Sequence, residues 1–189
     1  MTGKTHQVIG LTVGLGTYLA TSPSAYGPAT FAAVAVLSSI GALLPDIDSP
    51  AGKIWSYLPF GRTAGELVNP FLRHRNITHS LLGVAIVGFG MHLLLSHVPS
   101  YWGIQTMTVW VCFMAAYGSH IVADMVTVEG VPLLFPYHHM FGIPPWPLEG
   151  LRIETGGWFE NLIVFPSVNL ILIGMLWVSW AAIQTRLLH

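Results

Sequence analysis

Five long apolar stretches, separated by polar connections, constrain this chain more than any other feature. They cover residues 8–21, 30–44, 80–96, 106–123 and 161–183. Only 8% of the residues are charged, against about a quarter in an ordinary soluble domain. A water-exposed surface needs more polar side chains than that. A large buried core in a soluble helical protein is the alternative, but the sequence favours a membrane as the solvent.

The stretches predict an all-α fold: an integral membrane bundle of about five spans that forms one domain over residues 1–189. The first three stretches are shorter than the roughly 20 residues that cross a full hydrocarbon core, so close packing or a thinner bilayer must compensate. Gly10, Gly14 and Gly83 favour such packing, because small residues let helices approach. No cleavage-site pattern ends the first stretch, so we expect it to be retained.

The polar connections differ sharply in charge. Those at 45–79 and 124–160 carry most charged residues, whereas those at 22–28 and 97–105 carry none if histidine is neutral. The positive-inside rule therefore places the two charged connections in the cytoplasm, and five spans leave the C-terminus, with Arg186, outside. The net charge of -1 gives no basic surface, so we expect membrane lipids rather than nucleic acid as partners. The oligomeric state is left open.

Histidine and aspartate recur where the apolar stretches begin and end. His6 lies before the first stretch, His79 before the third, and Asp124 just after the fourth. Successive helices of an up-and-down bundle alternate in direction, so all these ends lie on one side of the membrane, the predicted cytoplasmic face. The predicted metal ligands are His6, Asp46, Asp48, His79, His120 and Asp124.

The local spacing of these residues suits metal coordination. His120 and Asp124 are four residues apart and share a helix face, and Asp46 and Asp48 share a face if the backbone is extended there. Imidazole with carboxylate suits zinc, with manganese or iron as alternatives, and the groups suffice for about one to three ions. Cys112 is the single cysteine, which excludes a Cys-rich site.

Each candidate ligand also has an ordinary structural interpretation. Asp46 alone is a solvated residue at a helix end, His79 alone is an interfacial or capping histidine, and His120 with Asp124 is a hydrogen-bonded pair. The joint pattern favours a site, because ionisable groups near membrane depth are costly and usually functional. The roles of His138 and His139 are left open.

The same motifs resemble a known family. After the early His6, the sequence has L-L-P-D-I-D-S-P at 43–50, H-R-N-I-T-H-S at 74–80, H-I-V-A-D at 120–124 and T-G-G-W-F-E at 155–160. This order resembles the YdjM-type bacterial inner-membrane metal-dependent hydrolases, also described as LexA-binding, inner membrane-associated hydrolases. The resemblance covers nearly the whole chain and implies a multi-pass inner-membrane protein with metal-dependent hydrolase activity. A looser likeness to zinc-dependent phospholipase C enzymes suggests a phosphoester substrate.

The predicted function is hydrolysis of an ester or phosphoester of a lipid or lipid-linked substrate at the cytoplasmic face. A metal ion would activate water, with Glu160 as general base or further ligand. His74 could protonate the leaving group, and the Arg75 guanidinium could hold a phosphate oxygen. The alternative is a non-enzymatic metal-binding protein for transport or partner recruitment, or a scaffold with a stabilising metal. Transport is disfavoured because the interiors of the stretches carry almost no ionisable groups.

Overall fold

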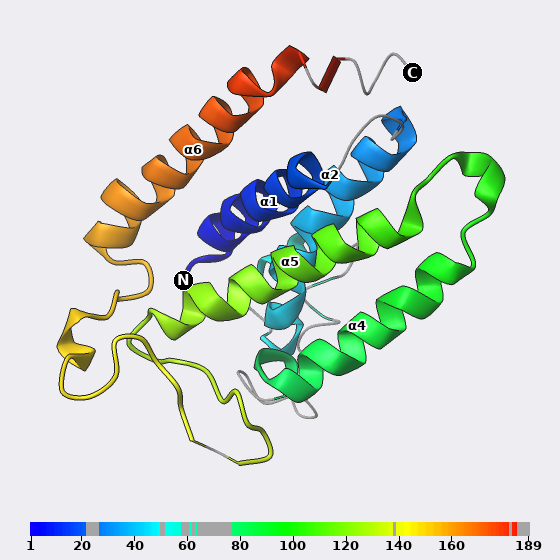
Figure 1. Cartoon of the computed structure of the whole chain (residues 1–189). Coiled ribbons are helices and arrows are strands. Elements are labelled where there is room, and N and C mark those ends of the chain that lie inside the picture. The colour runs from blue at the N-terminus through cyan, green and yellow to red at the C-terminus, as the bar shows by residue number, and fades with distance from the viewer. Residues whose placement is uncertain are drawn as a thin grey trace.

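Five α-helices form the part of the chain that the computed structural model describes (Figure 1). α1 (Gly3–Ala20) and α2 (Pro28–Leu43) pack against each other and against α5 (Thr106–Met125). α4 (Leu81–Ser96) packs on α5, and α6 (Phe165–Val178) packs on α1. The described residues are 1–21, 27–49, 52–57, 61, 63, 77–137, 139–181 and 183–184. The predicted all-α fold with five apolar helices is confirmed.

Short helical turns lie in the connections and at their ends. They are η1 (Leu44–Asp48), η2 (Lys53–Tyr57), η3 (Ile77–His79), η4 (Ser100–Trp102), η5 (Glu149–Leu151) and η6 (Glu160–Val164), the last being a wider turn that leads into α6. The described residues contain no strand beyond two isolated bridges, of which one joins Thr127 to Ile153.

Glycine lets α1 approach α2 closely. A Cβ atom on Gly14 would lie 2.0 Å from Ser38 Oγ, and one on Gly10 would lie 2.2 Å from Ala42 Cβ. Neither distance is compatible with a side chain at the glycine positions, so small residues four apart set the spacing of the two helices. This contact holds the first turns of α1 against the end of α2, where the candidate ligands lie.

Gly14→Ala is expected to destabilise the protein by about 1–3 kcal/mol, because the added methyl group overlaps Ser38. Thermal unfolding of the detergent-solubilised protein would measure the change. Gly174→Ala in α6 is the matched control, since nothing lies within 4 Å of a Cβ at that position. An equal melting temperature for the two variants would show that the α1–α2 contact does not limit stability.

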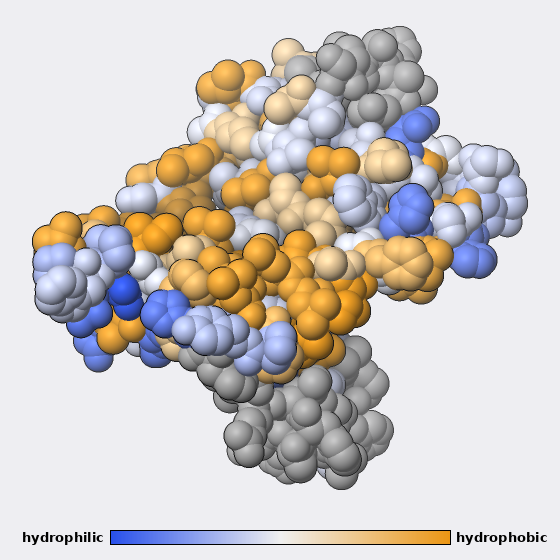
Figure 2. Space-filling model, turned by 60° about the horizontal axis from the view of Figure 1, so that its bottom comes forward, coloured by the Kyte–Doolittle hydropathy of each residue, from blue (hydrophilic) through white to orange (hydrophobic). Residues whose placement is uncertain are grey.

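The outer helices expose an apolar surface that suits lipid. Three helical segments are long and apolar enough to cross a membrane: Pro28–Asp48, Thr106–Met125 and Glu160–Val178. α4 is apolar but shorter, and α6 has no buried residue along its length. Figure 2 shows hydrophobic residues over much of one face, with hydrophilic residues grouped mainly near its edges. Such a surface is unfavourable in water and suits a bilayer. The prediction of five spans remains a prediction for α1 and α4.

Candidate metal centre

Five of the six predicted ligands meet at one end of the bundle. His6 lies in α1, Asp46 in η1 and His79 in η3, while His120 and Asp124 lie one turn apart in α5. All are buried except Asp46, whose side chain is 14% exposed. The alternating helix directions explain the convergence, because the start of α1 and the ends of α2 and α5 lie at the same level.

Asp46, His79 and His120 form the first group of candidate ligand atoms. His79 Nε2 lies 3.2 Å from His120 Nε2, and Asp46 Oδ1 lies 3.8 Å and 3.6 Å from these two nitrogens. Two ligands about 2.1 Å from a tetrahedral zinc ion are roughly 3.4 Å apart. The three atoms therefore have the spacing of a coordination triangle.

His6, His120 and Asp124 form the second group. His6 Nε2 lies 3.0 Å from Asp124 Oδ1, and the His6 ring stacks on the His120 ring with 3.6 Å between centroids. Both ring nitrogens of His6 are buried without an aligned hydrogen bond, and a bound cation would satisfy one of them. Asp124 Oδ2 also lies 3.6 Å from His79 Nε2, so this carboxylate connects the two groups.

Outer partners turn two of the imidazoles toward the centre. The Nδ1 of His120 lies 2.6 Å from the carbonyl oxygen of Ala42, and the Nδ1 of His79 lies 3.1 Å from Thr78 Oγ1. Thr78 also donates a hydrogen bond of 2.7 Å to Asp48. With their Nδ1 atoms engaged in this way, His79 and His120 present Nε2 to the shared space, which is the usual arrangement for histidine ligands.

Asp48 is placed behind His79 rather than beside Asp46. Its Oδ2 lies 3.7 Å from His79 Nδ1, on the far side of the ring from the other ligand atoms. An extended backbone would place Asp46 and Asp48 on one face, whereas η1 is a tight helical turn. With about three residues per turn, neighbours two apart point in different directions. Asp48 therefore connects to His79 through the Thr78 hydroxyl, and its predicted role as a metal ligand remains a prediction.

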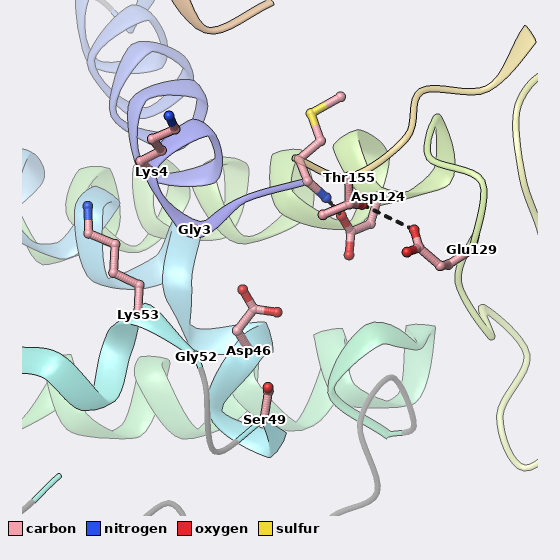
Figure 3. Close-up of a pocket in the computed structure, with 10 residues that line it drawn as sticks. Gly3, Lys4, Asp46, Ser49, Gly52, Lys53, Asp124, Glu129 and Thr155 are labelled. Carbon is pink, nitrogen blue, oxygen red and sulfur yellow. Dashed lines mark hydrogen bonds and ion pairs between the residues drawn. The ribbon is translucent and has the colours of Figure 1, made fainter. Parts of the chain in front are cut away.

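A pocket of about 430 Å³ opens beside the two groups. Figure 3 shows the carboxylates of Asp46 and Asp124 pointing into a common space, with Lys4 and Lys53 on one side and Glu129 on the other. The sequence motifs do not predict Lys4, Lys53 or Glu129 as part of the site. A signal was present for the lysines, because the chain has only seven Lys and Arg residues.

Glu160 lies at the junction of α1 and α6. Its Oε1 accepts hydrogen bonds from the Thr2 amide (2.8 Å) and from the hydroxyls of Thr2 and Thr5 (both 2.6 Å), and its Oε2 accepts one from the Gly156 amide (2.8 Å). These contacts position the start of α1, which carries His6. The predicted role of Glu160 as a general base remains a prediction.

The structure places only one of the remaining sequence-based candidates. His74, Arg75 and His138 lie outside the described residues. His139 is exposed and its ring contacts Tyr137 and Phe141. The roles predicted for His74 and Arg75 therefore remain predictions.

The fold and the site define a helical membrane protein with a buried His/Asp cluster at one end of the bundle. The model of the family described as YdjM inner membrane protein matches residues 1–187, so the chain belongs to this family. No solved structure matches the chain.

Two curated relatives differ in how much of the chain they match. The chain is 29% identical over 164 residues to the uncharacterized protein YvsG of Bacillus subtilis strain 168, covering 87% of this chain and 88% of that protein. It is 37% identical over 118 residues to the inner membrane protein YdjM of Escherichia coli K12, covering 59% of this chain and 54% of that protein. The matched region thus spans about half the length of the YdjM relative.

Proposed function

We propose that this protein is a multi-pass membrane hydrolase that uses a divalent transition metal, with zinc favoured, to cleave an ester or phosphoester of a lipid or lipid-linked substrate. The observation that carries the proposal is the pair of ligand groups that share His120, each with its atoms within 4.8 Å of one another. The donor set suits a borderline metal such as zinc, with manganese or iron as alternatives. The adjacent pocket gives a substrate access to the exposed side of Asp46.

The bound ion and the side chains have different roles in the proposed reaction. A bound ion supplies Lewis acidity, which polarises the scissile group and makes water more acidic. Water then adds to phosphorus or to the carbonyl carbon, the bond to the alcohol oxygen breaks, and this oxygen receives a proton. Glu129 lines the pocket and is suited to take a proton from the attacking water. Glu160 is the sequence-based candidate for the same role.

A non-enzymatic metal-binding role is the second candidate. The ligands come from α1, η1, η3 and α5, so an ion bound to them would tie separate elements together. Ligands that are almost completely buried suit a structural ion, because a structural zinc site is closed and a catalytic site keeps an open position. The open pocket beside Asp46 favours the hydrolase.

Removal and return of metal tests the hydrolase proposal. Membrane vesicles of known orientation would be supplied with phospholipids, polyprenyl phosphates and carboxyl esters. We expect hydrolysis of at least one of them, its loss on adding a membrane-impermeant chelator to inverted vesicles, and its return with zinc. The same chelator should leave right-side-out vesicles active, because the charge distribution predicts a cytoplasmic centre. If metal-replete protein hydrolyses none of these compounds, the hydrolase proposal is wrong and the non-enzymatic role is favoured.

A further inference from the structure

A second pocket, of about 610 Å³, lies between α1 and α2 beside η2. Its walls are mainly aliphatic, and its volume is within the range of about 300–1,000 Å³ found for small-molecule sites. Val36 and Ile40 line it and are themselves exposed. Both lie in the candidate span Pro28–Asp48, so the groove opens toward hydrocarbon if that segment crosses the membrane.

One polar residue connects this groove to the pocket at the metal centre. Gln7 lines the groove, and its side-chain oxygen accepts hydrogen bonds from the Lys53 ammonium group and from the Tyr57 hydroxyl (3.1 Å). Its amide nitrogen donates to Ser39 Oγ (2.8 Å). Lys53 in turn lines the pocket beside Asp46 and Asp124. The hydrogen bond between Gln7 and Lys53 therefore joins the wall of the apolar groove to the wall of the polar pocket.

Two lysine ammonium groups at the polar pocket have uncharged partners, whereas the amino terminus of Met1 pairs with Asp124 there. The Lys53 ammonium group is held by the neutral amide of Gln7, and the Lys4 ammonium group lies 4.9 Å from the centre of the Phe165 ring. Figure 3 shows both lysines on the same side of the pocket. Ammonium groups with no carboxylate partner among the described residues suit a bound anion, and lysine is a common phosphate-binding residue.

From these contacts we infer the substrate class of the proposed hydrolase, and the inference rests on that proposed function. The substrate is a membrane phospholipid that lies across both pockets. Its phosphate binds beside Lys53 and Lys4 next to the metal centre, and one apolar chain lies in the groove between α1 and α2. This arrangement orients the lipid, because burial of the apolar chain is favourable in the groove and the charged phosphate is favourable in the polar pocket that Lys53 lines.

Lipid binding can be measured without hydrolysis. Protein in detergent, treated with chelator, would be titrated with dioleoyl phosphatidic acid, dibutyryl phosphatidic acid and dioleoylglycerol, with complexes counted by native mass spectrometry. Val36→Trp fills the groove and should weaken dioleoyl phosphatidic acid binding by about tenfold or more while sparing the dibutyryl form. Val122→Trp in α5 is the matched control, since Val36 and Val122 are both 59% exposed and only Val36 lines the groove.

The head-group contact has its own variant. Lys53→Met keeps the apolar stem and removes the charge, so it should weaken both phosphatidic acids by about tenfold and leave dioleoylglycerol unchanged. Equal binding of the dioleoyl lipid by Val36→Trp and Val122→Trp would show that the acyl chain does not bind in the groove. Unchanged phosphatidic acid binding in Lys53→Met would show that the phosphate does not bind in this pocket.

The inference and the proposed function can fail separately. Binding with the expected pattern, but no hydrolysis by metal-replete protein, supports the lipid site and rejects the hydrolase. Hydrolysis of a long-chain phospholipid at equal rates in Val36→Trp and Val122→Trp supports the hydrolase and rejects the lipid site.

Discussion

His120→Ala is expected to remove nearly all transition metal from the purified protein. This imidazole belongs to both groups of ligand atoms, so the substitution removes one ligand from each group. His6→Ala affects only one of the two groups and should lower the metal content less. Asp48→Asn should lower affinity by only about 10–100-fold, because Asp48 orients His79 from behind. Elemental analysis after purification without chelator would give the metal content of each variant.

The control for this series is His92→Ala. His92 is an exposed histidine of α4 whose ring contacts Trp110, away from the cluster. Circular dichroism of each variant would show that helix content is retained, so that metal loss is not a result of unfolding. Equal metal in His92→Ala and His120→Ala would reject the centre. Equal losses in His6→Ala and His120→Ala would indicate that both side chains hold the same ion.

Glu129→Gln is expected to lower the rate of hydrolysis by about a hundredfold or more while the metal is retained, because general-base catalysis typically contributes 10²–10⁴-fold. Glu129 lines the pocket next to Asp46 and Asp124, and its Oε2 accepts a hydrogen bond of 3.1 Å from Thr155. The amide in the variant keeps the shape of the side chain and removes its basicity. Rates on the compound identified with wild-type vesicles, together with metal content, would be the measurements.

Glu160→Gln tests the role that the sequence alone assigns to Glu160. Both carboxylate oxygens of Glu160 accept hydrogen bonds. In the glutamine variant an NH2 group replaces one of these oxygens and would point at a hydrogen-bond donor. We expect a loss of stability of about 1–3 kcal/mol, seen in thermal unfolding, and a rate within about tenfold of wild type. If instead Glu160→Gln loses a hundredfold in rate at unchanged stability and Glu129→Gln does not, the base is Glu160.

Several features of the centre could be predicted from particular residues. Apolar stretches with almost no charge predicted the helices, and His6, His79 and Asp124 stand at their ends. In a bundle whose helices alternate in direction, chain position determines the end at which such residues lie. His120 and Asp124 needed only the helical repeat, because residues four apart share a face.

Other features depended on how the elements meet. The position of Asp48 followed from the tight turn η1, and Glu160 bonds to Thr2 and Thr5, which are far from it in sequence. Lys53 lines the pocket, and its neighbour Gly52 lies so close to Asp46 that an added Cβ atom would be 2.3 Å from the Asp46 carbonyl oxygen.

The sequence by itself therefore determined the helical membrane-type fold and the end of the bundle at which the His and Asp residues lie. Only the tertiary structure decided that His120 is shared, that Asp48 supports His79, and that lysines and an apolar groove lie beside the centre. The physical reason is that periodicity along one helix defines a face, whereas contacts between elements depend on their rotation and separation. Those are set by packing, here by Gly10 and Gly14 against α2.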